Sequence, residues 1–218
     1  MMKDIAIFGA GGFGREVACL IKQINETQVN HQWNLIGFFD DNNSLKDKMI
    51  SHFAPCLGGI VELNNWQKPI SIVIAVGSPN AVATIVRKIN NPNVDFPNMI
   101  HPSFSVNDID TFQIGKGNII QGGCAVTCDV SLGNFNVLNG SIVMGHDVRI
   151  GDYNCFMPAV RVSGEVHIGN CNFFGVGSII LQQLRIGNNI RLGAGSVLIT
   201  KPKDGKLYMG NPAKKIEF

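Results

Sequence analysis

Residues 150–169 read IGDYNCFMPAVRVSGEVHIG, with an apolar side chain at every sixth position. The same six-residue step continues without a break from Ile114 to Leu198. Ile-Gly or Leu-Gly pairs recur every eighteen residues, beginning at Ile114, Leu132, Ile150, Ile168 and Ile186. Each repeat buries its apolar residue only by stacking on the next repeat. Since three steps of six make eighteen, we expect a coil with three short strands and three corners per turn.

Small or polar side chains are expected to share the interior of this coil. Asparagine recurs every eighteen residues, at Asn118, Asn136, Asn154 and Asn172. Stacked amides of this kind can hydrogen-bond to one another along a ladder. The sequence therefore predicts a three-sided parallel β-helix, and its periodicity leaves the hand of the coil open. An ordinary β-sandwich is the alternative, but a sandwich has no physical reason to keep a fixed six-residue step.

A different pattern occupies the first part of the chain. An apolar run at residues 4–8 leads into Gly9-Ala10-Gly11-Gly12-Phe13-Gly14, and residues 15–24 have the spacing of an amphipathic helix. In this context a Gly-x-Gly-x-x-Gly turn can bind a phosphate, because the helix N-terminus has free N–H groups. Strands are also expected at residues 35–39 and 70–76, with a helix after the second. Three strands and two helices form an abbreviated Rossmann-like domain, which is too small for NAD.

Two carboxylates, Asp40 and Asp41, directly follow the second predicted strand. Acidic side chains at the carboxyl end of such a strand are placed to bind a ribose or a base. The glycine turn from Gly11 to Gly14 and this acidic pair can therefore form a nucleotide or nucleotide-sugar site. Alternatively, the turn only packs a helix on a strand and the carboxylates are only solvated. The sequence leaves both interpretations open.

The composition argues against several classes of protein. The formal net charge is +2 and no basic run is present, which argues against nucleic-acid binding. No apolar stretch is long enough to span a membrane. The N-terminus has no signal-peptide pattern, so we expect a cytoplasmic protein with reduced cysteines. We expect residues 1–95 to form the Rossmann-like domain. Residues 96–218 are expected to form the β-helix, with a lysine-rich tail that returns along its outside.

His146 is the most informative of the five histidines. It lies two residues after an inward position, and therefore at a corner, and Asp147 follows it directly. A carboxylate beside an imidazole fixes its tautomer and raises its basicity, as general-base catalysis requires. Gly164 lies one coil later at the same corner and leaves room for a ligand to approach. The alternative is a surface histidine in a turn.

The remaining histidines do not predict a metal site. His167 precedes an inward position, so it should point outward, and it has no obvious partner in the sequence. His31, His52 and His101 are isolated. A zinc site requires three or more converging ligands, so we predict no metal. The sequence also lacks the Gly-x-Ser-x-Gly motif that would support acyl-enzyme chemistry.

Together these motifs resemble a known family. The six-residue repeat is similar to that of the hexapeptide acyltransferases, whose fold is a left-handed parallel β-helix. Five further motifs narrow the resemblance to one group within this family. They are the N-terminal glycine motif, Asp40-Asp41, His101-Pro102, Gly145-His146-Asp147 and Gly210-Asn211-Pro212-Ala213-Lys214. This set resembles the sialic-acid O-acetyltransferase-like sugar acyltransferases, which include the nucleotide-amino-sugar N-acetyltransferases of bacterial surface-glycan synthesis.

The resemblance implies an acetyl-CoA-dependent sugar acetyltransferase that transfers the acetyl group directly, with His146 as the general base and Asp147 as its acidic neighbour. It also implies a homotrimer in which the acetyl-CoA groove lies between adjacent subunits. Gly164, Val176 and Ala194 match positions whose main chain lines this groove. Cys155 stands where these enzymes often carry a second histidine beside acetyl-CoA.

On the acceptor side, the resemblance implies that Asp40 and Asp41 contact a nucleoside and that the sugar lies near Gly11, Gly12 and Phe13. Phe13 stands where the nucleotide-sugar enzymes often carry a histidine. N-acetylation of a nucleotide-linked amino-sugar is therefore the predicted reaction. The alternatives are O-acetylation of a sugar, of the sialic-acid type, or a non-catalytic trimer that binds a nucleotide sugar. A hexapeptide-repeat carbonic anhydrase would need zinc histidines that are missing from the coil.

Overall fold

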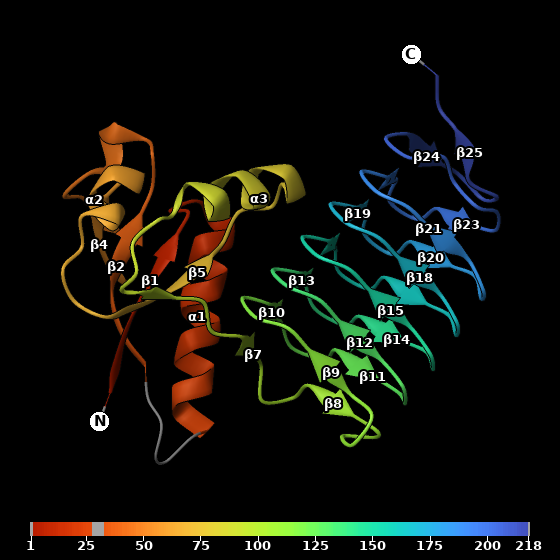
Figure 1. The fold of residues 1–218 in the computed structure, drawn as a ribbon, viewed down its shortest axis with the longest axis horizontal. Coiled ribbons are helices and arrows are strands. Elements are labelled where there is room, and N and C mark those ends of the chain that lie inside the picture. Colours follow the sequence, from red (N-terminus) through yellow and green to blue (C-terminus); the bar gives the residue numbers. More distant parts are fainter. Residues whose placement is uncertain (1, 28–32, 218) are drawn as a thin grey trace. The chain divides into compact units, whose positions relative to one another are not determined.

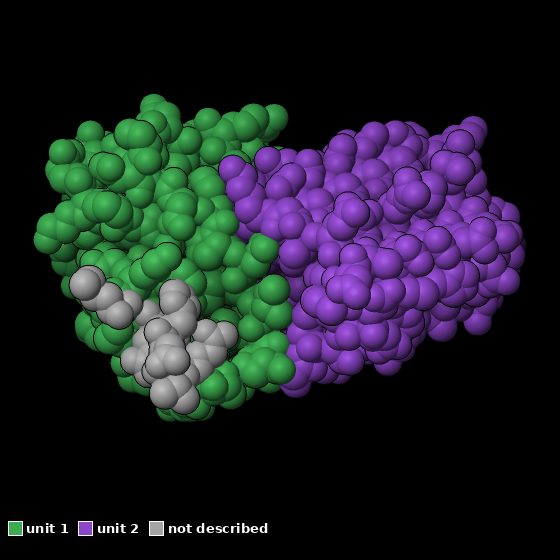
Figure 2. All heavy atoms as spheres, turned by 60° about the horizontal axis from the view of Figure 1, so that its bottom comes forward, with its two compact units in different colours: residues 1–77, 81–102 green, residues 78–80, 103–218 purple. Residues whose placement is uncertain are grey.

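The computed structural model describes residues 2–27 and 33–217, and the chain divides into two compact units (Figure 2). Unit 1 comprises residues 1–77 and 81–102, and unit 2 comprises residues 78–80 and 103–218. Among the described residues, none of the helices combines the length and the apolar character needed to cross a membrane.

Unit 1 is built on a six-stranded sheet. Its strands are β1 (Lys3–Phe8), β2 (Trp33–Phe39), β3 (Met49–Ile50), β4 (Ala54–Gly58), β5 (Ile70–Ile74) and β6 (Val94–Asp95). They are arranged in the order β3-β4-β2-β1-β5-β6. All neighbouring strands are parallel except β3 and β4. The sheet is thus of the parallel, Rossmann-like type expected from the glycine motif.

Helices connect these strands and complete the core of unit 1. They are α1 (Gly12–Thr27), α2 (Ile60–Asn64) and α3 (Pro79–Lys88), with a short 3₁₀ turn η1 (Asn43–Leu45) and a final strand β7 (Met99–Ile100). α1 packs against β1 and β2, and α2 packs against β4. The apolar face of α1 is buried as predicted, at Val17, Leu20, Ile21 and Ile24.

Unit 1 contains more elements than the three strands and two helices that the sequence predicts. The structure adds β3, β4, β6 and α2, all of which are five residues long or shorter. β4 has the sequence APCLG, in which proline and glycine conceal a strand. β3 and β6 have two residues each, so no periodicity can reveal them. Their existence depends on the neighbouring strands rather than on local sequence.

Unit 2 is a three-sided, left-handed parallel β-helix, coloured from green to blue in Figure 1. We name its three sheets by the order in which each full coil visits them. The first face contains β10 (Ile119–Ile120), β13 (Val137–Leu138), β16 (Cys155–Phe156), β19 (Phe173–Phe174), β22 (Arg191–Leu192), β24 (Leu207–Met209) and β25 (Lys214–Lys215). The second face contains β8 (Ser105–Val106), β11 (Ala125–Val126), β14 (Val143–Met144), β17 (Arg161–Val162), β20 (Ile179–Ile180) and β23 (Val197–Leu198). The third face contains β9 (Gln113–Ile114), β12 (Ser131–Leu132), β15 (Arg149–Ile150), β18 (His167–Ile168) and β21 (Arg185–Ile186).

The six-residue period predicts the core of the coil correctly. Every position of the series from Ile120 to Leu198 is buried, and Ile114 in the first coil is half-buried. Paired strands join residues eighteen apart, such as Ile150 and Ile168. The side chain before each inward position points to the outside of the prism, because successive residues of a strand face opposite sides.

The predicted asparagine ladder is present in the interior. Asn136 Nδ2 donates to Asn118 Oδ1 at 3.1 Å, Asn154 Nδ2 to Asn136 Oδ1 at 3.0 Å, and Asn172 Nδ2 to Asn154 Oδ1 at 2.9 Å. Each of these oxygens also accepts the backbone N–H of the next asparagine. This inner ladder satisfies polar groups that would otherwise be buried at a cost of about 1–3 kcal/mol each.

A second ladder at the same corner explains the glycine after each inward residue. The backbone N–H groups of Asn134, Asp152 and Asn170 each donate at 2.7 Å to the side-chain oxygen of the residue eighteen positions later. A Cβ atom on Gly133 would lie 2.5 Å from Asp152 Oδ1, which is too close for any side chain. In each Ile-Gly or Leu-Gly pair, the first residue points into the coil. The glycine that follows has no side chain, so it leaves space for the side-chain oxygen of this second, outer ladder.

The tail after Leu198 continues the coil instead of returning along its outside. β24 pairs in parallel with β22, and β25 then pairs antiparallel to β24. Tyr208 is buried, but it lies sixteen residues after Leu192 rather than eighteen, so the period did not reveal it. The tail thus adds two strands to the first face, the parallel β24 and the antiparallel β25.

We predict that Asn154→Ala lowers the free energy of unfolding by about 2–4 kcal/mol, because two donors of Asn172 lose their buried acceptor. The measurement is chemical denaturation followed by circular dichroism. Asn188→Ala is the matched control, since its bonds are exposed and water can replace them, so it should cost about 1 kcal/mol or less. Equal losses in the two variants would contradict this account of the inner ladder.

Candidate functional site

His146 and Asp147 lie at the corner between the second and third faces. His146 Nδ1 lies 2.8 Å from Asp147 Oδ2, and the two side chains are 56% and 57% exposed. Asp147 has a φ of 58°, a left-handed conformation that aspartate tolerates better than most residues. Because the carboxylate accepts the proton on Nδ1, the lone pair of the neutral imidazole lies on Nε2. Nε2 is therefore the basic atom of this pair.

The main chain of Gly164 lies against that basic atom. A Cβ atom on Gly164 would be 2.5 Å from His146 Nε2 and 2.7 Å from Cε1. The coils are also joined here by a hydrogen bond of 2.8 Å from Glu165 N to the His146 carbonyl. The glycine predicted one coil after the histidine thus leaves the space that the imidazole occupies. Any larger residue at this position would displace the ring.

The other residues of the expected acetyl-CoA groove lie elsewhere on the coil. Val176 and Ala194 are one coil apart at the corner between the first and second faces, where Gly195 N donates to the Val176 carbonyl at 2.8 Å. Cys155 lies in β16 and is only 4% exposed. Burial raises the pKa of its thiol to about 12, so Cys155 stays protonated at neutral pH. Within one chain, Val176 and Ala194 lie at a different corner from His146, and Cys155 lies on the first face.

The glycines of the N-terminal motif have two different roles. Gly9 has a φ of 113°, and a Cβ atom there would lie 2.5 Å from the carbonyl oxygen of Ala75. A Cβ atom on Gly14 would overlap the carbonyl of Gly9, so α1 can approach the loop only at a glycine. In contrast, a Cβ atom on Gly11 would meet no other atom within 4 Å, and one on Gly12 only the end of an arginine side chain. The outer glycines therefore permit packing, while the inner ones leave the backbone open.

Asp40 and Asp41 organise the rim of the sheet in unit 1. Asp40 Oδ2 accepts from Ala10 N and its Oδ1 from Asn42 N, both at 2.9 Å. Asp41 Oδ1 accepts from Ile60 N at 2.9 Å, at the start of α2. Asp40 thus ties the end of β2 to the glycine loop after β1. The carboxylates are more than solvated side chains, because Asp40 fixes the backbone beside the open glycines and Asp41 fixes the start of α2.

The structure also locates Phe13, His52 and the cysteines. Phe13 is half-buried in the first turn of α1. His52 is exposed, with its Nδ1 3.2 Å from Ser51 Oγ, and His31 lies outside the described residues. All six cysteines are free. Within the described parts of the chain, no three His, Cys, Asp or Glu side chains converge in a way that could hold a metal ion.

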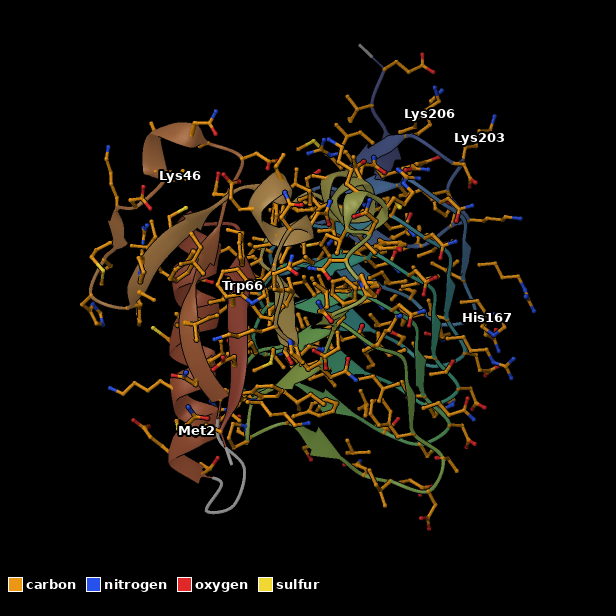
Figure 3. All side chains as sticks on the ribbon, turned by 60° about the vertical axis from the view of Figure 1, so that its left-hand side comes forward. Met2, Lys46, Trp66, His167, Lys203 and Lys206 are labelled. Carbon is orange, nitrogen blue, oxygen red and sulfur yellow. The ribbon has the colours of Figure 1, made fainter. Side chains whose placement is uncertain are left out.

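Sequence reasoning missed the partner of His167. Its side chain lies on the outside of the third face (Figure 3), and Arg185 Nη1 lies 3.1 Å from His167 Nδ1. Partial burial, followed by the charges of Arg185 and Arg149, lowers the pKa of His167. The eighteen-residue spacing of Arg149, His167 and Arg185 is the signal that could have identified this column.

The comparison with protein families matches residues 4–89 to the PglD N-terminal domain. This match includes the glycine motif, the Asp40-Asp41 pair and the strands of the parallel sheet as far as β5. No curated protein matches the sequence.

Solved structures match over nearly the whole chain. The acetyltransferase domain of PglB from Neisseria gonorrhoeae FA1090, in complex with acetyl coenzyme A, shares 27% identity over 99% of this chain and 100% of that one, with a TM-score of 0.85. PerB from Caulobacter crescentus, in complex with CoA and GDP-perosamine, shares 24% over 100% and 99%, with a TM-score of 0.86. WeeI from Acinetobacter baumannii AYE shares 24% over 99% and 100%, with a TM-score of 0.85. The last two show the likeness of the fold. Residues 4–89 therefore match a domain of the PglD type, and the whole chain has the left-handed β-helix fold and is similar to solved acetyltransferases.

We predict that Asp40→Ala speeds the hydrogen exchange of the Ala10 and Asn42 amides by roughly 10- to 100-fold. Each amide loses a charge-assisted bond worth about 1.5–3 kcal/mol. The measurement is amide exchange followed by NMR. Asp4→Ala is the control, because Asp4 accepts from the exposed side chain of Asn34. Unchanged exchange at Ala10 would mean that the carboxylate does not hold the glycine loop.

We also predict that His167 titrates below its ordinary pKa of 6.5 and that Arg185→Gln raises this pKa only partly, because burial remains. Since the folded-state pKa lies below the unfolded value, His167 reduces stability as the pH falls through 6.5. NMR titration of the imidazole provides the measurement, with Arg87→Gln in α3 as the control. A pKa at or above 6.5 in the wild type would contradict the prediction.

Proposed function

We propose that this protein transfers the acetyl group of acetyl-CoA to the amino group of a nucleotide-linked sugar. The observation that carries the proposal is the His146–Asp147 pair, whose basic Nε2 lies over Gly164 at an exposed corner of the coil. The PglB acetyltransferase domain, which matches this chain along its whole length, binds acetyl coenzyme A in its structure. This supports acetyl-CoA as the donor.

Unit 1 supports a nucleotide-linked acceptor. Its match to the PglD N-terminal domain includes the open backbone at Gly11 and Gly12, the first turn of α1 with Phe13, and the acidic pair Asp40-Asp41. Free N–H groups at a helix N-terminus favour phosphate, while carboxylates at the end of β2 can accept hydrogen bonds from a ribose or a base. We infer that this rim holds the nucleotide and that the amino-sugar extends from it.

The reaction we propose is a direct transfer. The sugar nitrogen attacks the thioester carbonyl carbon, and its proton passes to His146 Nε2 while Asp147 stabilises the imidazolium that forms. A backbone N–H beside the groove would stabilise the oxyanion. The C–S bond then breaks, CoA leaves as the thiol after taking the proton, and the amide remains on the sugar. Cys155 takes no part as a nucleophile, since its pKa of about 12 keeps it neutral.

We further infer that the active enzyme is a cytoplasmic homotrimer. His146 and the pair Val176 and Ala194 lie at the two corners that border the second face, and a threefold assembly can bring such corners of adjacent subunits together. The outward column of that face carries Val143 and Ile179, which are 37% and 36% exposed.

The experiment that tests the function is CoA release, measured by thiol detection, with acetyl-CoA and a panel of acceptors. The panel contains UDP-, GDP- and dTDP-amino-sugars together with sialic acid and simple galactosides. Turnover that requires one nucleotide amino-sugar is expected. Turnover only with a hydroxyl sugar would make the protein an O-acetyltransferase. Absence of turnover together with absence of acetyl-CoA binding would favour a non-catalytic protein.

We predict that His146→Ala lowers kcat by about 10²–10⁴-fold, because it removes the base that accepts the proton of the amine. Acetyl-CoA should still bind, since the imidazole is not needed to hold the donor. His52→Ala is the matched control, because it removes an exposed histidine from unit 1 and should leave kcat unchanged. A His146→Ala variant with near wild-type kcat would show that another group is the base.

A further inference from the structure

The outer surface of the third face carries a column of three nitrogen-rich side chains. Arg149, His167 and Arg185 occupy equivalent positions in β15, β18 and β21, and parallel strand pairing places them in register. Neighbouring strands lie about 4.8 Å apart, so the column spans roughly 10 Å from Arg149 to Arg185. All three precede an inward residue and therefore point outward.

These side chains line one hollow on the surface of the coil. It has a volume of about 470 Å³ and is lined by Asp147, Arg149, Glu165, His167, Gln183 and Arg185. Asp147 is the carboxylate that holds His146. The hollow therefore begins beside the candidate base and extends for two coils toward the C-terminus. It consists entirely of polar and charged side chains.

The two arginines in the hollow keep their charges available. In the described parts of the chain, neither Arg149 nor Arg185 forms an ion pair with a carboxylate, although both share the hollow with Asp147 and Glu165. The Asp147 carboxylate is held by His146, and the Glu165 carboxylate accepts from Gln183 Nε2 at 3.3 Å.

His167 contributes a further donor to the same column. The guanidinium of Arg185 donates to His167 Nδ1, so the ring proton lies on Nε2. The column therefore presents two planar guanidinium groups and one N–H. Guanidinium groups match the geometry of phosphate oxygens particularly well.

We propose that Arg149, His167 and Arg185 bind phosphate groups of the nucleotide part of the acetyl donor. This inference rests on the proposed function, because it assumes that acetyl-CoA is the donor. Two substrates carry such groups, the donor and the nucleotide-linked acceptor. The position of the column favours the donor. It rises from the coil of His146 toward the C-terminus, through the coils that contain Gly164 and Val176, while the acceptor positions lie in unit 1.

The kinetic test compares donors with and without phosphates in the double variant Arg149→Gln with Arg185→Gln. For acetyl-CoA we expect KM to rise by at least about 10- to 100-fold, because the variant loses two charged groups that bind phosphate, with kcat within about twofold. For acetyl-pantetheine, which lacks all the phosphates, KM should not change. Arg87→Gln in α3 is the control for a removed surface charge. An equal rise of KM for both donors would overturn the proposal.

A binding test separates this proposal from the proposed function, because it does not depend on turnover. Adenosine 3′,5′-bisphosphate and UDP are titrated by calorimetry into the wild-type protein and the double variant. Weaker binding of the bisphosphate alone supports the donor assignment, even if no acceptor is turned over. Weaker binding of UDP alone would assign the column to the acceptor and overturn the proposal. Equal affinities of wild type and variant for both probes would also overturn it.

Discussion

The functional geometry of unit 2 depends on one constraint, the register in which each strand pairs with the strand eighteen residues later. The inner ladder fixes this register, because each buried amide has a donor and an acceptor that meet the next amide only at this offset. A shift by one residue would turn every inward side chain outward. The contact of His146 with Gly164, and the alignment of Arg149 with Arg185, both follow from this register.

Unit 1 reaches its geometry by a different route, in which close approach of the backbone replaces repetition. Glycine at positions 9 and 14 lets α1 begin directly against β1, and Asp40 then bonds the loop between them to the end of β2. The rim of this parallel sheet is therefore held by backbone hydrogen bonds to a carboxylate. A rigid rim suits recognition, because fewer conformations must be given up when a ligand binds.

The parts of the structure that sequence could predict are those in which one local rule is repeated many times. The six-residue period and the asparagine column are both present in the structure, since stacking imposes the same environment at each repeat. The contact of His146 with Asp147 could be predicted for another reason, because the two residues are adjacent in the sequence. β4 and α2 could not be predicted, because five residues are too few to show a period, and β4 also contains proline and glycine. β24 was missed because its phase slips by two residues. The contact of His167 with Arg185 was missed because residue types vary at positions that point outward. The eighteen-residue spacing of these two side chains therefore does not stand out in the sequence.

The last strand of the first face affects whether the coils of two molecules can pair end to end. A parallel β-helix ends in strands whose backbone groups could accept another coil, and an exposed edge of this kind is a template for pairing with a second chain. On the first face, the edge is β25, which runs antiparallel to β24 and consists of Lys214 and Lys215. The reversed direction breaks the repeat, and two adjacent positive charges repel an identical edge. The strand that closes this face thus opposes end-to-end growth into a fibre, to which a regular stack of identical coils would otherwise be prone.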